Sequence, residues 1–185
     1  MEEKTPGLLL QAIPYLGQKK ILKVFTPLGL ISLFAKTSQL TPFCIAEWVY
    51  QKTEKELYPL SDTTLLDPLS ELRQSYNLLT AAGTMAKDLL RSQLPNKGSP
   101  ELYQLACLYF KKLPASPDML VASFRLKLLL HEGLLSSDPE PSFTPTEWEQ
   151  VATLAFARQF STLYGLPAAP TEKIALLFEE RLIHH

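Results

Sequence analysis

The sequence predicts an α+β protein in which a small five-stranded β-barrel is followed by an all-helical domain. Two observations support this prediction: β-type apolar runs alternate with turn residues up to residue 66, and helix-start signals recur after it. The 185 residues are 46% hydrophobic and 20% charged, a globular composition that excludes disorder or coiled coil as a description of the whole chain. We therefore expect two domains, at residues 1–66 and 67–185.

Five apolar runs are the predicted strands, and turn residues such as Pro14 and Pro27 separate them. The runs span residues 8–13, 21–25, 30–35, 43–50 and 56–60. Closing so few strands into a barrel removes the exposed edges that an open sheet of this size would leave.

Helix starts are marked four times by a capping residue followed by proline at the first helical position. These pairs are Asp67-Pro68, Ser99-Pro100, Ser116-Pro117 and Thr144-Pro145. Glu147 completes a capping box with Thr144. With glycine and proline as stop signals, the predicted helices cover residues 68–94, 100–113, 117–132, 145–164 and 171–182.

Charges are grouped along the chain although the net charge is only −1. Residues 4–46 hold five lysines and no acid, and residues 73–127 hold eight basic residues against three acids. Such blocks can form a positive face that attracts polyanions or acidic peptides. The alternative is that these side chains only keep the two segments soluble.

The sequence lacks the motifs of common enzymes. It contains no phosphate-binding glycine loop and no nucleophile elbow. His131-Glu132 begins like a metalloprotease motif, but Leu135 stands where the second histidine is needed. Cys44 and Cys107 lie in apolar runs and are expected to be buried, inert thiols. We expect no catalytic residue, no metal and no cofactor, so the chain is predicted not to be an enzyme.

Targeting and membrane signals are also missing from the sequence. The acidic opening is followed by only three leucines before Gln11, and no run of 18 apolar residues occurs. We expect a cytoplasmic protein with reduced cysteines and no membrane partner.

Several short motifs follow one another in a recognisable order. They are Pro14-Tyr15-Leu16-Gly17, the strand ending in Phe25-Thr26, the strand ending in Ala35-Lys36, Thr41-Pro42-Phe43, the segment 56–66, and the Phe124-Arg125 helix closing on Gly133. In this order, across about residues 8–135, the chain resembles the RecO family of recombination mediators.

The resemblance implies an N-terminal OB-fold, a helical domain and a role in recombinational DNA repair. Family members bind DNA, anneal complementary single strands and, with RecR, help RecA replace the single-stranded-DNA-binding protein. The implied partners are single- and double-stranded DNA, RecR, the acidic C-terminal tail of the single-stranded-DNA-binding protein and, indirectly, RecA. The implied location is the nucleoid.

The first candidate site is a DNA-binding face on the barrel. OB barrels hold single strands in a basic groove with aromatic platforms. We expect the phosphate contacts to come from four of the five lysines of the acid-free segment, namely Lys19, Lys20, Lys23 and Lys36. Tyr15, Phe25 and Phe34 are interleaved with them and are the expected platforms.

The second candidate site is a pocket for the acidic tail in the helical domain. Arg125 suits the carboxylate because a guanidinium can grip it through two parallel hydrogen bonds. Phe124, Lys127 and Tyr109 are expected to complete the pocket. The alternative is that Arg125 pairs with an internal acid, such as Glu101 or Glu132, or reaches solvent.

The chain departs from the family pattern at two places that bear on function. Lys36 is followed by the short segment 37–40 instead of glycine and a long basic loop. The stretch 136–145 has no cysteine where many members carry a four-cysteine zinc module. The short loop leaves open a second function, a protein-interaction adaptor whose barrel no longer binds DNA.

Overall fold

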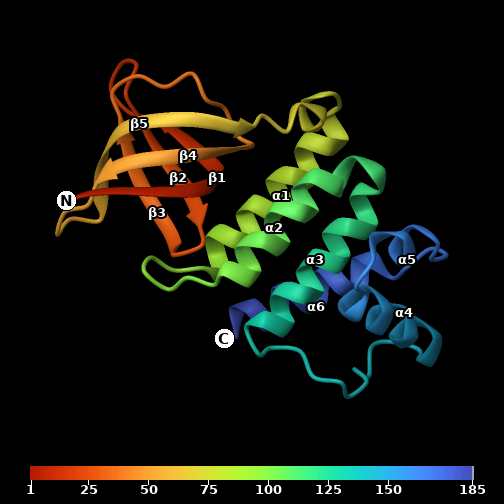
Figure 1. Ribbon diagram of the computed structural model, residues 1–185. Coiled ribbons are helices and arrows are strands. Elements are labelled where there is room, and N and C mark those ends of the chain that lie inside the picture. The colour runs from red at the N-terminus through yellow and green to blue at the C-terminus, as the bar shows by residue number, and fades with distance from the viewer. Residues whose placement is uncertain (185) are drawn as a thin grey trace. The chain divides into compact units, whose positions relative to one another are not determined.

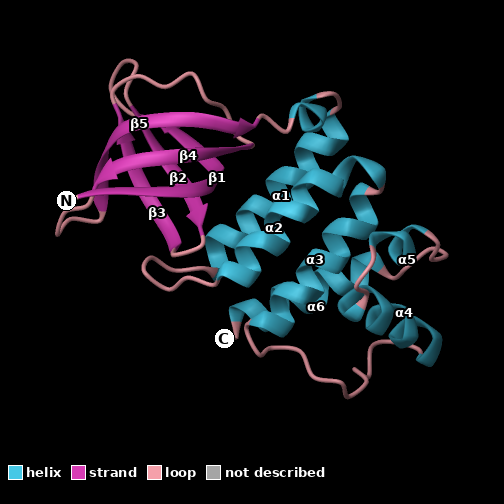
Figure 2. Cartoon of the chain, in the orientation of Figure 1, coloured by secondary structure: helices cyan, strands magenta, loops and turns pink. Residues whose placement is uncertain are grey.

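The computed structural model describes residues 1–184 and has an α+β fold, with a five-stranded sheet followed by helices (Figures 1 and 2). This agrees with the predicted class. The chain forms two compact units, the first at Met1–Lys111 and the second from Lys112 onward. The change from strand to helix at Asp67 lies next to the predicted domain boundary, but the first unit also contains two helices.

Every strand of the sheet has two partners. The strands are β1 (Glu2–Pro14), β2 (Lys20–Thr26), β3 (Gly29–Ala35), β4 (Cys44–Gln51) and β5 (Leu57–Asp67). Their order is β1-β2-β3-β5-β4, and β4 pairs with β1, so the sheet closes on itself. Strand β1 is long enough to pair with β4 along its first half and with β2 along its second, and its register shifts between Leu9 and Gln11. Such a bulge bends a strand, as closure requires.

The inside of the closed sheet is filled by side chains at alternate strand positions. Leu22, Val24 and Leu33 are fully buried there, and so is Trp48. Burial of such side chains contributes about 1.5–3 kcal/mol each. The Trp48 indole N–H donates to the Gly7 carbonyl at 3.1 Å, which satisfies the polar atom of this side chain inside the core.

The first unit continues with η1 (Ser70–Arg73), α1 (Tyr76–Ser92) and α2 (Pro100–Lys112). The prediction that the first helix begins after Asp67 was wrong. The Asp67 carboxylate accepts the Leu69 N–H at 2.9 Å, and Leu69 has a left-handed conformation (φ 48°), so the chain turns instead of starting a long helix. Helix α1 starts later, where the Ser75 hydroxyl accepts the Leu78 N–H at 3.1 Å.

The second unit contains η2 (Leu113–Ala115), α3 (Pro117–His131), α4 (Pro145–Phe156), α5 (Phe160–Tyr164) and α6 (Thr171–Ile183). Helix α3 is central because it packs on both α4 and α6. The predicted helix at 145–164 is two helices, with a break at residues 157–159. The Lys127 ammonium donates to the Ala157 carbonyl at 2.9 Å, so a side chain of α3 satisfies the backbone at the break. Within residues 1–184, no helix has the length and apolar character needed to span a membrane.

Candidate nucleic-acid interface

The outer face of the β2–β3 hairpin has a basic centre. Inward residues alternate with outward ones along a strand, so the buried Leu22 and Val24 leave Ile21 and Lys23 on the outer face. Lys23 lies opposite Ser32 on β3, and its ammonium donates to the Ser32 hydroxyl at 2.8 Å. This hydrogen bond fixes the cation on the outer surface while its charge remains available.

Aromatic side chains flank this centre at the end of the hairpin near the β1–β2 turn. Tyr15 is 48% exposed and meets Phe34 edge-to-face, with ring centroids 6.2 Å apart. The Tyr15 N–H donates to the Lys19 carbonyl at 2.8 Å, which closes the turn and holds the ring over the hairpin. An exposed ring of this kind provides a stacking surface for a nucleic-acid base.

The prediction that Phe25 is a stacking platform was wrong. Phe25 is 1% exposed, and its ring packs on Tyr103 of α2 at 6.0 Å. It points outward from the barrel as predicted, but a helix of the same unit covers it. The strand pattern alone does not show which part of an outer face a helix covers.

The predicted lysines have different surroundings. Lys19 and Lys36 are exposed, at the two ends of the segment that contains the hairpin. Lys20 is partly buried, and its ammonium donates to the Ser38 carbonyl at 3.2 Å. Lys4, outside the predicted set, pairs with Glu47 at 3.2 Å.

Strand β5 widens the outer face in a way that sequence reasoning missed. It runs parallel to β3 and places Leu57 opposite Ser32 and Pro59 opposite Phe34. Both are exposed, whereas Tyr58 between them is buried inside the sheet. A parallel pairing of strands that are not consecutive leaves no local signal, so only the structure identifies these two residues.

The structure provides no support for a metal or nucleophile site. Among residues 1–184, no three His, Cys, Asp or Glu side chains are grouped as metal ligands would be. Cys44 and Cys107 are buried free cysteines. Burial raises the pKa of Cys44 to about 11 and also raises that of Cys107, so both remain thiols at neutral pH.

Comparison with known proteins identifies relatives of the chain. No family model matches it. DNA repair protein RecO of Chlamydia muridarum is 33% identical over 146 residues, covering 73% of this chain and 62% of that protein. RecO of Chlamydia trachomatis is 32% identical over 146 residues, with 73% and 60% covered. RecO of Chlamydia pneumoniae is 28% identical over 222 residues, with 97% and 88% covered. The chain belongs to the RecO family.

The chain spans less than two thirds of the length of the first two relatives.

For this RecO-family chain, the predicted tail pocket consists mostly of core residues. Phe124 is fully buried in α3, and Tyr109 is 2% exposed in α2. The Lys127 ammonium donates its hydrogen bond to the Ala157 carbonyl, and burial lowers the pKa of Lys127. Phe124 and Tyr109 therefore serve the packing of the core, and a tail peptide would have to bind the exposed surface of α3.

Arg125 contacts two side chains of α6, Phe178 and Glu179. Its guanidinium lies over the Phe178 ring, 5.0 Å from the centroid, and its Nη2 is 4.0 Å from the carboxylate of Glu179. The side chain is 14% exposed. The structure therefore places Arg125 beside an internal acid, Glu179, which was not among the acids named from the sequence, while the tail-binding role stays a prediction.

Proposed function

We propose that the chain is a non-enzymatic DNA-binding mediator of recombinational DNA repair. Its closed sheet is proposed to be an OB-fold that holds single-stranded DNA across the outer face of β2 and β3. The observation that supports this most strongly is the grouping of Lys23 and Phe34 on the β2–β3 hairpin with exposed Tyr15 in the adjoining β1–β2 turn, within a segment without acids from residue 4 to residue 46. The ammonium group can neutralise a phosphate, and the aromatic rings can stack on the bases.

Partners are proposed from the family alone. We infer that the chain anneals complementary strands and, with RecR, helps RecA replace the single-stranded-DNA-binding protein on DNA. The names of the RecO relatives, as DNA repair proteins, support the process but not each partner. Annealing of labelled complementary strands coated with single-stranded-DNA-binding protein is the direct assay, and acceleration by the chain is the expected result.

Salt-dependent binding to a labelled oligo-dT strand tests the DNA site. We expect the double variant Lys19→Glu, Lys36→Glu to bind more weakly, because both residues are exposed and no other described residue pairs with their ammonium groups. Each lost phosphate contact on a single strand reduces the slope of log K against log salt by about 0.7, so the slope should flatten by about 1.4.

The matched control replaces two exposed lysines outside the barrel, Lys87→Glu and Lys112→Glu, which makes the same change in charge. If both double variants lower affinity equally, the protein's overall charge and not the hairpin carries binding. If the unmodified protein shows no binding even at low salt, the DNA-binding proposal is wrong and the adaptor function is the better one.

A further inference from the structure

The loop between α1 and α2 is docked on the β2–β3 hairpin (Figure 1). The Leu30 N–H donates to the Leu94 carbonyl at 3.3 Å, and Leu30 forms a parallel bridge with Pro95. Strand β5 reaches β3 only from Ser32 to Phe34. The loop therefore continues the sheet along the part of β3 that β5 leaves unpaired.

Two glycines make this docking a backbone-to-backbone contact. A Cβ on Gly98 would lie 2.3 Å from the Pro27 carbonyl oxygen, and one on Gly29 would lie 2.9 Å from the Leu94 carbonyl oxygen. Gly29 also has φ +113°, a conformation that other residues rarely adopt. Since neither position has room for a side chain, the loop is held at a fixed place beside the hairpin turn.

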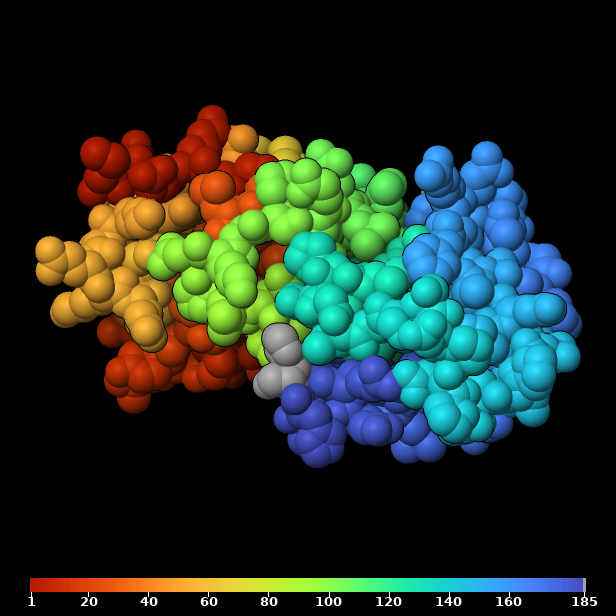
Figure 3. Space-filling model, turned by 90° about the horizontal axis from the view of Figure 1, so that it is seen from below, coloured from red at the N-terminus to blue at the C-terminus, as the bar shows by residue number. Residues whose placement is uncertain are grey.

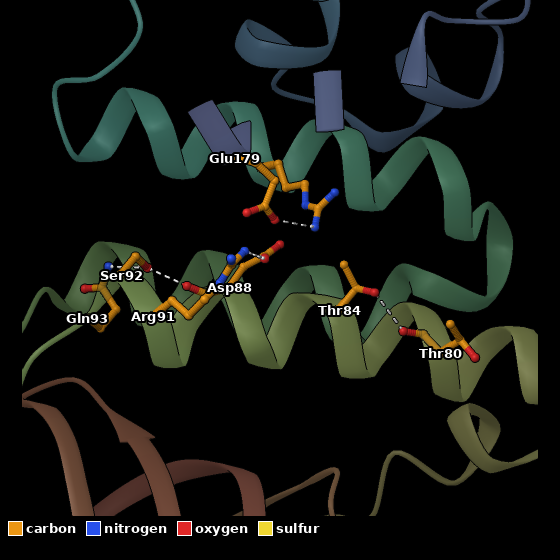
Figure 4. Close-up of polar contacts among 8 residues, drawn as sticks. Thr80, Thr84, Asp88, Arg91, Ser92, Gln93 and Glu179 are labelled. Carbon is orange, nitrogen blue, oxygen red and sulfur yellow. Dashed lines mark hydrogen bonds and ion pairs between the residues drawn. The ribbon is translucent and has the colours of Figure 1, made fainter. Parts of the chain in front are cut away.

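Lys97 is the cation that this docking places at the hairpin. Its backbone nitrogen would be 3.0 Å from a Cβ on Gly29, and the residue is exposed. Within residues 1–184, no side chain forms a hydrogen bond or ion pair with its ammonium group. The neighbouring cation is already used, because Arg91 pairs with Asp88 at 3.0 Å (Figure 4).

The surroundings of Lys97 resemble those of the hairpin face. Residues 89–100 contain no acid, and the loop lies at the surface in Figure 3 (yellow-green). Leu94 is 55% exposed, and Leu28 in the hairpin turn is 62% exposed, so apolar side chains accompany the cation. The nearest acid after the loop, Glu101, accepts the Ser99 hydroxyl at 3.3 Å.

The cations have a regular spacing along the hairpin. Lys97 lies beside Gly29, and Lys23 lies opposite Ser32 on the same strand. The backbone distance along β3 from Gly29 to Ser32 is three residues, or about 10 Å. Three more residues lead to Ala35, which precedes Lys36. We propose that the α1–α2 loop is part of the DNA interface and that Lys97 binds a phosphate beyond the hairpin turn. This inference rests on the proposed function and adds a segment to it.

The test compares single variants in oligo-dT binding over a range of salt concentrations. We expect Lys97→Gln to flatten the salt slope by about 0.7 and to weaken binding about fivefold at 0.1 M salt, as the loss of one phosphate contact predicts. Lys97→Arg should restore both values because it retains the charge. Lys87→Gln, which removes an exposed lysine from the middle of α1, should change neither. Equal thermal unfolding midpoints for these variants would show that the loop remains docked.

The outcomes separate the two proposals. If Lys23→Gln weakens binding but Lys97→Gln does not, the hairpin binds DNA and the loop inference is wrong. If the unmodified protein does not bind, the proposed function itself fails. Photo-cross-linking of a strand that contains 5-iodouracil gives a second measurement, and a cross-linked peptide that includes Leu94 to Lys97 is expected. Cross-links confined to the hairpin would overturn the inference.

Discussion

The lysines of the proposed DNA face differ in how much of their hydrogen-bonding capacity is free. Lys20 donates one hydrogen bond to the Ser38 carbonyl in the β3–β4 loop, and Lys23 donates one to the Ser32 hydroxyl on β3. An ammonium group has three donors, so both retain charge and donors for a phosphate, but part of their capacity is already used. Lys19 and Lys36 make no such bond, and we therefore expect them to have larger effects per residue on affinity.

At the residue scale, Arg125 gives a prediction about the tail peptide. Glu179 already provides a carboxylate 4.0 Å from the guanidinium, so an incoming carboxylate must compete with it. If the tail binds here, Arg125→Ala should cost about 1.5–3 kcal/mol of peptide binding, as expected for a charge-assisted hydrogen bond. Glu179→Gln should strengthen binding, because it removes the competitor. Fluorescence titration with a short acidic peptide that ends in apolar residues measures both effects.

The stability of the same variants shows whether Arg125 has only a structural role. Arg125→Ala removes the contact with the Phe178 ring as well as the ion pair, so its unfolding midpoint should fall in either case. Glu179→Gln is the informative variant. If it fails to raise peptide affinity, Arg125 serves the packing of α3 on α6 and not the tail.

At the element scale, an ion pair between α4 and α6 predicts a dependence on pH. Glu147 accepts a hydrogen bond from the Lys173 ammonium at 2.7 Å and another from the Thr144 N–H at 2.9 Å. The Lys173 bond is the main reason that the pKa of Glu147 lies below its usual 4.5. A carboxylate with a lowered folded pKa stabilises the protein above its unfolded pKa, and this contribution is lost as the pH falls through the folded value.

Glu147→Gln should therefore lower the unfolding midpoint at pH 7, and its difference from wild type should shrink as the pH falls below 4.5. Thermal unfolding followed by circular dichroism at several pH values measures this difference. Glu149→Gln is the control, since Glu149 is exposed on the same helix and its carboxylate has no partner in the described chain. A difference for Glu147→Gln that stays constant with pH would contradict the prediction.

Elements with a strong local signal were predicted well from the sequence. Helices α2, α3 and α4 start at the predicted prolines, and the predicted Thr144–Glu147 capping box is present. Long-range effects explain the errors. Strand β5 extends to Asp67 because it pairs with β4 as far as Ile45, and residues 157–159 leave the helix where Lys127 supplies a donor from α3. Neither partner is close in sequence.

The candidate site was predicted only in part for the same reason. Lys23 and Phe34 could be found because they lie on paired strands of one hairpin, where the two-residue period of strands defines a face. Tyr15 could be found because it lies in the turn just before β2. Leu57 and Lys97 reach that hairpin from β5 and from the α1–α2 loop, through contacts between segments far apart in the chain. No local pattern in the sequence indicates such contacts.

At the scale of the whole molecule, the near-zero net charge conceals an unequal distribution. Residues 1–111 contain 12 basic and 10 acidic residues, whereas the remaining residues contain 6 basic and 9 acidic ones. The unit with the closed sheet is thus the more positive, as a DNA-binding unit should be. Because the excess is small, binding must depend on where the lysines are grouped, and this is why charge-matched control variants are needed.

Metal content is a further property of the whole chain that can be predicted. Structural zinc takes four ligands, usually cysteine thiolates or histidines. Cys44 and Cys107 are both buried, and burial favours their neutral thiol form over the thiolate that zinc binds. We expect elemental analysis of the purified chain to find far less than one zinc per molecule, and EDTA to leave the unfolding midpoint unchanged. One equivalent of zinc that is lost in Cys44→Ser or Cys107→Ser would contradict this prediction, because it would require a cysteine to leave the core in order to bind the metal.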